Sequence, residues 1–292
     1  MEIMSIKELS RYLKTNEQLL YKMVQKSRIP SSKINGKIVF VKEVIDKWVL
    51  ENTVRERHVY LTGSDDMLLR TVIDVYNSDR DELVYYAPIG SMRGLEVLKE
   101  GGATISCVHI LDIDKKDYNP SYVQRYLGTD DYVVIHLFMR EQGLCLQKGN
   151  RKNIDSLEDL TAEGVLFVNR NKGCGTRLLF DYLLHEKGID PHAIKGYERA
   201  MESHSEMETA LTVLNGKADA GFCIRHAAHI LGLGFTTLAR ESFDMVVPTE
   251  RFHSTQVKSF LSFFDQAELV RHVRDFTGYD ISRMGQILYP HP

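Results

Sequence analysis

Three hydroxyl residues in this 292-residue sequence stand where they could donate hydrogen bonds to a small anion. Ser64, Ser91 and Thr176 each directly follow a glycine, which lets the backbone approach a ligand closely. A tetrahedral oxyanion has four acceptor oxygens, so it needs a cage of O–H and N–H donors. Helix N-termini supply such N–H groups together with a favourable dipole. The three turns therefore predict an oxyanion site, if the fold brings them together.

Residues near these turns would add charge and further donors. Arg177 follows Thr176 and could clamp an anion through two parallel N–H groups, while Gly175 offers its backbone N–H. Arg170 and Arg93 are further candidates for the role of Arg177. Each turn taken alone is better explained as an ordinary helix N-cap. It is the occurrence of three such turns in one expected cleft that favours ligand binding.

His109 and Asp112 end a predicted strand near an expected hinge. Their side chains can either point into the cleft or satisfy the hinge backbone, so His109 is kept as a candidate ligand-binding residue. The four cysteines are scattered without a CxxC pair, and His226 and His229 lack a neighbouring group of ligands, so no metal site or cofactor is expected. The patterns of a P-loop and of a GxSxG hydrolase do not occur.

The elements that must position these residues alternate between strand and helix from residue 58 onward. Such alternation predicts an α/β fold with helices on both faces of parallel strands, and ligands of these sheets lie beyond the carboxyl ends of the strands. The expected segments are strands at 58–63, 83–91 and 103–112, long extended runs at 132–148 and 235–248, strand-turn-helix at 164–188, and helix-turn-strand at 205–224.

Two such α/β units joined by extended segments describe a two-lobed domain over residues 53–292. One lobe is expected over roughly 53–135, closed by a helical C-terminal tail from Gln256. The other lobe is expected over 136–245. The cleft between the lobes would then hold the glycine-flanked hydroxyl residues.

Residues 1–52 show a different pattern. Ser5 and Glu8 form a predicted capping box, and Asn16 is the N-cap candidate of a second short helix. An Asn-Gly pair at Asn35 lies between extended residues, which is a strong hairpin signal. Helix, turn, helix, two-stranded wing and helix make a winged helix-turn-helix. The last helix is expected over residues 42–50, with three side chains facing inward: Val44, Ile45 and Trp48.

Charge separates the same two parts of the chain. Residues 1–52 hold ten basic and six acidic residues, a balance of +4, whereas the remaining 27 basic and 34 acidic residues give −7. A basic N-terminal part joined to a more acidic remainder favours a module that binds a polyanion, attached to a domain with a different function.

Hydrophobic residues make up 43% and charged residues 26%, which is typical of a globular protein. With no apolar run of membrane length and no signal-peptide pattern, a cytoplasmic location without membrane contact is expected.

The string KELSRYLKTNEQLLYKMVQKSRIPSSKINGKIVFVKEVIDKWV resembles the excisionase/MerR-type DNA-binding domain over almost all of residues 5–50. The resemblance implies binding to double-stranded DNA, with the second helix in the major groove and the wing on the backbone. It departs from the family at Asn16-Glu17, where Ser-Arg is common and where Glu17 would repel phosphate. The implied groove residues are Gln18, Tyr21 and Lys22, and the implied phosphate contacts are Lys14, Lys26, Arg28, Lys33 and Lys37.

The body is similar to the molybdate-binding-protein-like domain, which has a periplasmic-binding-protein-like fold. The motifs that carry the resemblance are GSDD (63–66), IGSMRGL (89–95), HILD (109–112), REQGL (140–144), VNRNKGCGTR (168–177), KADAGFCIR (217–225) and GYDISRMG (278–285). The resemblance implies molybdate or tungstate as ligand. It departs at Cys174, where the family commonly has serine, so a strong hydroxyl donor is missing from that loop.

Together these features predict a transcriptional regulator that binds DNA, as a homodimer on a two-fold site, and senses molybdate or tungstate. One alternative keeps the regulator but changes the ligand to a small organic anion, sulfate or phosphate. Another is an enzyme on the same two-lobed scaffold, such as a dehydratase, with His109 or Asp112 as acid or base. The sequence favours a protein that is not an enzyme, because it contains no catalytic motif.

Overall fold

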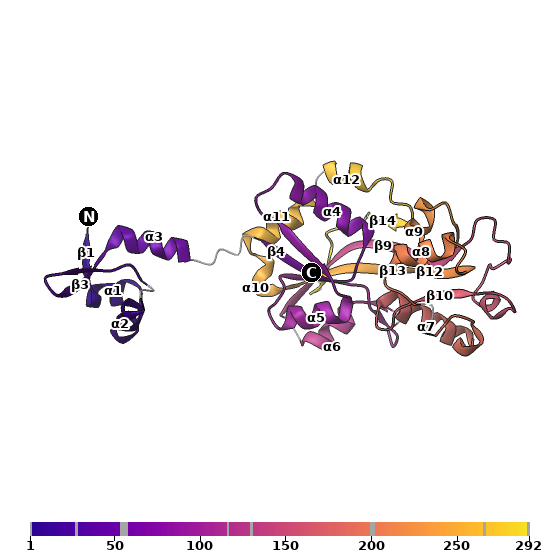
Figure 1. Cartoon of the computed structure of the whole chain (residues 1–292), viewed down its shortest axis with the longest axis horizontal. Helices are drawn as coiled ribbons and strands as arrows, with labels where there is room; N and C mark the ends of the chain where they lie inside the picture. The colour runs from indigo at the N-terminus through magenta and orange to yellow at the C-terminus, as the bar shows by residue number, and fades with distance from the viewer. Residues whose placement is uncertain are drawn as a thin grey trace. The chain divides into compact units, whose positions relative to one another are not determined.

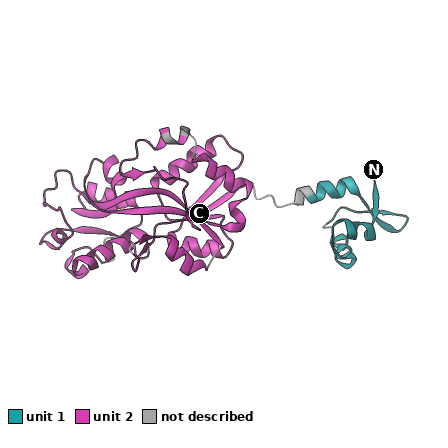
Figure 2. Ribbon diagram, turned by 180° about the vertical axis from the view of Figure 1, so that it is seen from behind, with its two compact units in different colours: residues 1–56 teal, residues 57–292 magenta. Residues whose placement is uncertain are grey.

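The computed structural model describes residues 2–26, 29–52, 58–115, 117–128, 131–198, 202–264 and 267–290. The chain forms two compact units, residues 1–56 and 57–292, which are coloured separately in Figure 2. The sequence placed this boundary slightly earlier, after residue 52. Within the described ranges, no helix is both long and apolar enough to cross a bilayer.

The N-terminal unit begins with the two short helices that its capping residues predict. Ser5 Oγ accepts the N–H of Glu8 at 3.4 Å and the Glu8 carboxylate accepts the N–H of Ser5 at 2.7 Å, which confirms the capping box. Asn16 caps the second helix by accepting the N–H of Leu19 at 2.7 Å. The elements of this unit are β1 (Ile3–Ser5), α1 (Ile6–Tyr12), α2 (Glu17–Gln25), β2 (Ser32–Ile34), β3 (Lys37–Val41) and α3 (Lys42–Asn52).

The wing has one strand more than the sequence predicted. Asn35 and Gly36 have φ angles of 48° and 79°, as the favoured two-residue hairpin turn requires, and β2 pairs with β3 as expected. β1 pairs with the other edge of β3, with Ile3 opposite Val41. A strand of three residues is too short to show a periodicity, so the sequence did not reveal it.

The core of the N-terminal unit is narrow. Leu9, Phe40 and Ile45 are fully buried, whereas Trp48 is only partly buried against this cluster. The prediction that Val44 faces inward was wrong, because its side chain is 47% exposed. Adjacent helix residues point about 100° apart, so a short helix that buries Ile45 turns Val44 toward the solvent.

Two long strands form the frame of the C-terminal unit. β9 (Tyr132–Leu146) and β13 (Gly234–Pro248) run antiparallel side by side through both lobes (Figure 1). They lie at the centre of one curled sheet, in which the strand order is β11 (Glu202–Ser203), β10 (Phe167–Arg170), β12 (Ala220–Ile224), β9, β13, β6 (Ile105–Val108), β4 (Val59–Gly63) and β5 (Val84–Pro88). They therefore connect a first lobe built on β6, β4 and β5 with a second lobe built on β12, β10 and β11.

The first lobe has the parallel strands and the helices expected from its alternating pattern. β4 pairs in parallel with both β5 and β6. The C-terminal tail returns to this lobe as helices, as predicted, and then adds the short strands β14 and β15 against β9, which were not predicted. The elements are β4 (Val59–Gly63), α4 (Met67–Ser78), β5 (Val84–Pro88), α5 (Ser91–Lys99), β6 (Ile105–Val108), β7 (Leu111–Asp112), β8 (Asp117–Tyr118), α6 (Pro120–Leu127), α10 (Thr249–Phe252), α11 (Thr255–Phe263), α12 (Ala267–Val273), β14 (Tyr279–Asp280) and β15 (Ile287–Tyr289).

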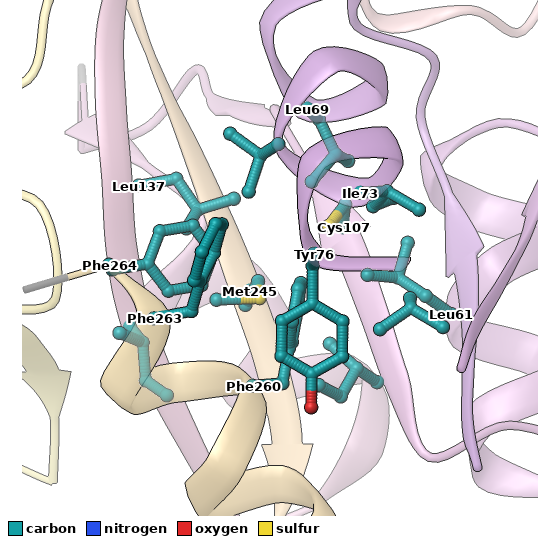
Figure 3. Close-up of a cluster of buried hydrophobic side chains, with 14 of the residues drawn as sticks. Leu61, Leu69, Ile73, Tyr76, Cys107, Leu137, Met245, Phe260, Phe263 and Phe264 are labelled. Carbon is teal, nitrogen blue, oxygen red and sulfur yellow. The ribbon is translucent and has the colours of Figure 1, made fainter. Parts of the chain in front are cut away.

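The tail is held by an aromatic core that Figure 3 shows in close-up. The ring of Tyr76 on α4 meets Phe260 and Phe263 on α11 edge to face, at centroid distances of 5.2 and 5.5 Å. Edge-to-face contacts add to the gain from burying these rings. Helix α11 is therefore an integral part of the first lobe.

The second lobe has its own core around the stacked rings of Phe167 and Phe180, whose centroids are 4.8 Å apart. β10 pairs in parallel with β12, which pairs antiparallel with β9. The elements are the 3₁₀ helix η1 (Glu158–Thr161), β10 (Phe167–Arg170), α7 (Gly175–Lys187), the 3₁₀ helix η2 (Pro191–Ala193), β11 (Glu202–Ser203), α8 (Glu206–Leu214), β12 (Ala220–Ile224) and α9 (Arg225–Ile230).

Candidate functional site

A cavity of about 430 Å³ lies between the two lobes of the C-terminal unit. The first lobe and the second lobe contribute equally to its wall. Its lining consists of Ser64, Asp65, Pro88, Ile89, Gly90, Met92, Arg93 and His109 from the first lobe, and Arg170, Asn171, Lys172, Gly173, Cys174, Thr176, His204 and Glu206 from the second.

The two glycine-flanked serines of the first lobe meet at this cavity. Their Oγ atoms lie 2.5 Å apart, although Ser64 lines the cavity and Ser91 is buried just behind it. Ser91 Oγ also accepts the N–H of His109 at 3.3 Å. Gly63 has a φ of 112°, and a Cβ there would lie 2.1 Å from the carbonyl oxygen of Cys107, so only glycine fits before Ser64.

The helices that start at the cavity differ in how well their first turns are capped. α5 follows Gly90, which has no side chain to cap it, so the N–H groups at its start remain open to a ligand. α7 is capped by Cys174 Sγ, which accepts the N–H of Arg177 at 3.4 Å and is a weak acceptor. By contrast α4, in the first lobe, is capped by the Asp66 carboxylate at 3.0 Å. The starts of α5 and α7 thus offer N–H groups and the positive end of a helix dipole to an anion.

Arg170 supplies a buried charge on the second-lobe wall. Its side chain is 6% exposed, its NH1 atom donates to the Glu206 carboxylate, and its Nε has no hydrogen-bond partner among the described residues. Burial opposes the charged guanidinium, but Glu206 outweighs it and raises the pKa of Arg170. A buried donor without a partner calls for an acceptor, and an anion bound in the adjoining cavity would be one.

Glu206 is a residue of this wall that the sequence reasoning missed. It begins α8, is 7% exposed, and accepts Thr176 Oγ1 at 2.8 Å and the N–H of Ile224 at 3.0 Å in addition to Arg170. A carboxylate at a helix start is favoured by the dipole, and the SEME segment (205–208) carried that signal. The Glu206 carboxylate therefore adds a hydrogen-bond acceptor to a cavity wall that also carries the donor Arg170.

The other predicted arginines form ion pairs on their own helices. Arg177 does not line the cavity, because its Nε donates to Asp181 at 2.8 Å and its guanidinium lies 4.3 Å from the ring centroid of Tyr197. The i,i+4 spacing of Arg177 and Asp181 on one helix could have indicated this pairing. Arg93 lines the cavity but is exposed and pairs with Glu96 at 2.7 Å.

His109 brings the two lobes into contact. Its ring lies against Gly175 at the start of α7, where a Cβ would be 2.4 Å from His109 Cε1 and 2.7 Å from its carbonyl oxygen. Gly175 itself does not line the cavity. Asp112, the other strand-end candidate, accepts from Arg125 at 2.8 Å and does not line the cavity either.

A buried ion network passes behind His109 through the two hinge strands. His109 Nδ1 lies 3.0 Å from Glu241, which also binds Arg140, and Arg140 donates to Asp66 at 2.7 Å. Burial alone would raise the pKa of Glu241, but Arg140 and then His109 lower it to about 2. Gln142 joins Glu241 at 2.8 Å to the second lobe, so the network contacts both walls. The sequence did not indicate this network, because its members lie far apart along the chain.

In the described part of the chain, no three His, Cys, Asp or Glu side chains are grouped as metal ligands would be. The expectation that no metal or cofactor is needed stays a prediction.

The N-terminal unit exposes the residues that its resemblance assigned to DNA. Gln18, Tyr21 and Lys22 are exposed along α2, next to the exposed Leu19. The lysines assigned to phosphate are exposed as well, and Arg28 lies outside the described residues: the lysines are Lys14, Lys26, Lys33 and Lys37. These residues therefore remain DNA-binding predictions with suitable exposure.

Known proteins resemble both units. Residues 3–53 match the helix-turn-helix domain model, and residues 77–265 match the PBP superfamily domain model. The chain is 26% identical to the uncharacterized protein YvgK of Bacillus subtilis over 97% of each chain. An ABC-type phosphate transport receptor from Vibrio cholerae shares its fold with a TM-score of 0.55 at 14% identity, over 77% of this chain and 99% of that one. The structure of a tungstate ABC transporter from Geobacter sulfurreducens gives a TM-score of 0.53 at 12% identity, over 76% and 99%.

The domain match covers more than half of the chain, and the order of its strands and lobes agrees with the predicted two-lobed fold. The protein is therefore a member of the PBP superfamily that carries an N-terminal helix-turn-helix domain.

Proposed function

We propose that this protein is a transcriptional regulator whose DNA binding responds to a small anion held between the lobes of its C-terminal unit. The observation that carries the proposal is the cavity lined by Arg170, with its unpartnered Nε, by the uncapped start of α5 and by the weakly capped start of α7. The helix-turn-helix unit supplies the means to bind DNA. Such a chain acts where DNA is accessible, so a cytoplasmic location belongs to the proposal.

The response requires that the anion binds one arrangement of the lobes better than another, since equal affinity for both would shift nothing. The contact between His109 and Gly175 joins the two lobes, so we expect it to be made in a closed arrangement and lost in an open one. A homodimer on a two-fold DNA site is part of the proposal, since a single small module buries little surface on DNA.

Molybdate or tungstate is the first candidate ligand. The motifs of the body support it, as does the fold shared with the tungstate transporter structure. Both are tetrahedral dianions that fit a cage of N–H and O–H donors.

Phosphate is a second candidate, and Glu206 is the observation that favours it. A carboxylate in the cavity wall prefers a ligand that can donate a proton to it, and molybdate and tungstate carry none at neutral pH. Hydrogen phosphate does carry one, and the phosphate receptor has the same fold. Neither matched domain belongs to an enzymatic family, so catalysis is not proposed.

Selection of DNA by the full chain tests this function. Duplexes would be selected from a random pool, and the best one titrated by fluorescence anisotropy with and without molybdate, tungstate or phosphate. We expect at least one of these anions to change the DNA affinity by about tenfold. Selection of no DNA sequence, or the same affinity with every anion that binds, would contradict a regulator.

A further inference from the structure

The cavity is larger than an inorganic oxyanion needs. Its volume of about 430 Å³ falls within the range of about 300–1,000 Å³ found for sites of small organic molecules. At about 30 Å³ per water it would hold on the order of 14 waters, of which a bare tetrahedral anion displaces only a few. The remaining volume must hold either water or a further part of the ligand.

The two walls already meet at one point beside this space. The ring and carbonyl oxygen of His109 occupy the position that a Cβ on Gly175 would take, so the first lobe rests on the start of α7 there. The volume is that of the arrangement in which this contact is made.

The walls of the cavity are chemically divided. Donors for an anionic head come from Arg170 and from the starts of α5 and α7. On the first-lobe side, Pro88 and Ile89 are exposed and Met92 is half-buried, so apolar carbon lines the part of the cavity next to the start of α5. An aliphatic group placed there would remove apolar surface from water.

Glu206 adds a requirement on the head of the ligand. It accepts bonds from Thr176, Ile224 and Arg170, so it is held as a fixed acceptor in the wall. A ligand oxygen that keeps its proton can donate to this carboxylate, whereas a proton-free dianion is repelled by it.

On these grounds, and resting on the proposed function, we propose that the ligand is an organic oxyanion with a tetrahedral phosphoryl or phosphonyl head that keeps one proton and carries one short aliphatic substituent. The head binds at Arg170 and the helix starts, and the substituent lies against Ile89 and Met92. Alkylphosphonates and phosphate monoesters share this chemistry in their singly protonated forms, and a monoester, whose second pKa is about 6, keeps that proton mainly below neutral pH.

Calorimetric titration of the full chain with four probes tests the proposal: ethyl phosphate, ethylphosphonate, inorganic phosphate and molybdate. A buried methylene contributes about fourfold in affinity. We therefore expect at least one ethyl compound to bind about tenfold more tightly than phosphate and molybdate, and the tighter of the two identifies the source class. Tighter binding of phosphate or molybdate would overturn the organic ligand and leave the anion-responsive regulator standing. No heat with any probe would overturn both.

A matched pair of variants locates the substituent. Ile89→Ala removes an apolar side chain that is 43% exposed at the cavity, and Ile230→Ala removes one that is 46% exposed but does not line it. We expect Ile89→Ala to weaken the ethyl compound about fivefold and phosphate by less than twofold, while Ile230→Ala changes neither. An unchanged affinity for the ethyl compound in Ile89→Ala would overturn this assignment.

Discussion

The walls of the interlobar cavity begin their helices in different ways. On the first-lobe side α5 starts behind Gly90 with neutral donors, and the arginine next to it, Arg93, pairs with Glu96 on its own helix. On the second-lobe side α8 starts with Glu206, whose charge is matched by the buried Arg170. The first wall therefore offers backbone amides, apolar carbon and the partly exposed charges of Asp65 and Arg93, whereas the second offers a buried ion pair. If an anion binds as proposed, we expect the second lobe to select its charge and protonation and the first lobe to select its shape.

The double variant Arg170→Gln/Glu206→Gln tests whether the second-lobe wall supplies the charge that binds the anion. Replacing both partners leaves neither charge buried alone, so the fold is retained. We expect anion affinity to fall by about 100-fold, which corresponds to about 2.7 kcal/mol, because charge-assisted hydrogen bonds are the strong ones. Calorimetry with the tightest-binding probe measures this loss.

The matched control is Arg93→Gln, which changes an exposed arginine of the same cavity. It should alter the affinity by less than twofold. A loss as large as that of the double variant would mean that the first lobe supplies the charge that binds the anion, which would contradict the difference between the two walls.

A low pH should weaken the buried ion network of Glu241, Arg140 and His109, which contacts both walls of the cavity. The folded-state pKa of Glu241 is about 2, below its ordinary value near 4.5, so its stabilisation is present above pH 4.5 and is lost as the pH falls toward 2. The free energy of unfolding should drop by about 2 kcal/mol between pH 7 and pH 3 from this group. Urea titrations across this range measure the drop.

Glu241→Gln serves as the comparison protein in these titrations. The variant should be less stable than the natural protein at pH 7, and the gap should narrow as the pH falls. A gap that stays constant with pH would mean that Glu241 is not ionised in the folded protein.

Gly175→Ala tests whether the walls meet as described. The new Cβ would collide with His109, so the closed arrangement becomes less populated and apparent anion affinity should fall about tenfold. Small-angle scattering with the anion present should show a more open unit. Gly234→Ala, where a Cβ would make only ordinary contacts, the nearest at 3.4 Å, is the control and should bind as before. Equal affinities in the two variants would refute the closure contact.

Cys174→Ser should have the smallest effect. A hydroxyl is a better cap for α7 than the thiol that now accepts from Arg177 at 3.4 Å. We expect thermal unfolding to show a gain of about 0.5–1 kcal/mol and anion affinity to change by less than threefold. A loss of stability would show that the thiol is favoured there by packing.

The part of the site that could be predicted is local in the chain. Ser64 and Thr176 were identified from turn chemistry, Arg170 and Arg93 from their charge, and His109 from its place at a strand end. All five line the cavity. Ser91 and Gly175 support it from behind. Whether any of these residues contacts a ligand stays a prediction.

The part that could not be predicted depends on partners distant in sequence. Arg177 and Arg170 lie in the same motif, but Arg177 pairs with Asp181 one turn along its own helix, whereas Arg170 pairs with Glu206, 36 residues away. Nothing in the motif itself distinguishes their directions. In the same way, nothing in the extended run around Glu241 indicates that this residue pairs with Arg140 and His109.

Most helices and strands and their ends could be predicted from the sequence alone, except short strands such as β1, β14 and β15, because capping boxes, the Asn-Gly turn and hydrophobic periodicity act between residues a few positions apart. The capping of α1 by Ser5 and the extent of β13 followed from such patterns. Only the tertiary structure decided which charges face the cavity and how large that cavity is. Both depend on the packing of β9 and β13 between two lobes, which brings together residues such as Asp66 and Glu241 from distant parts of the chain.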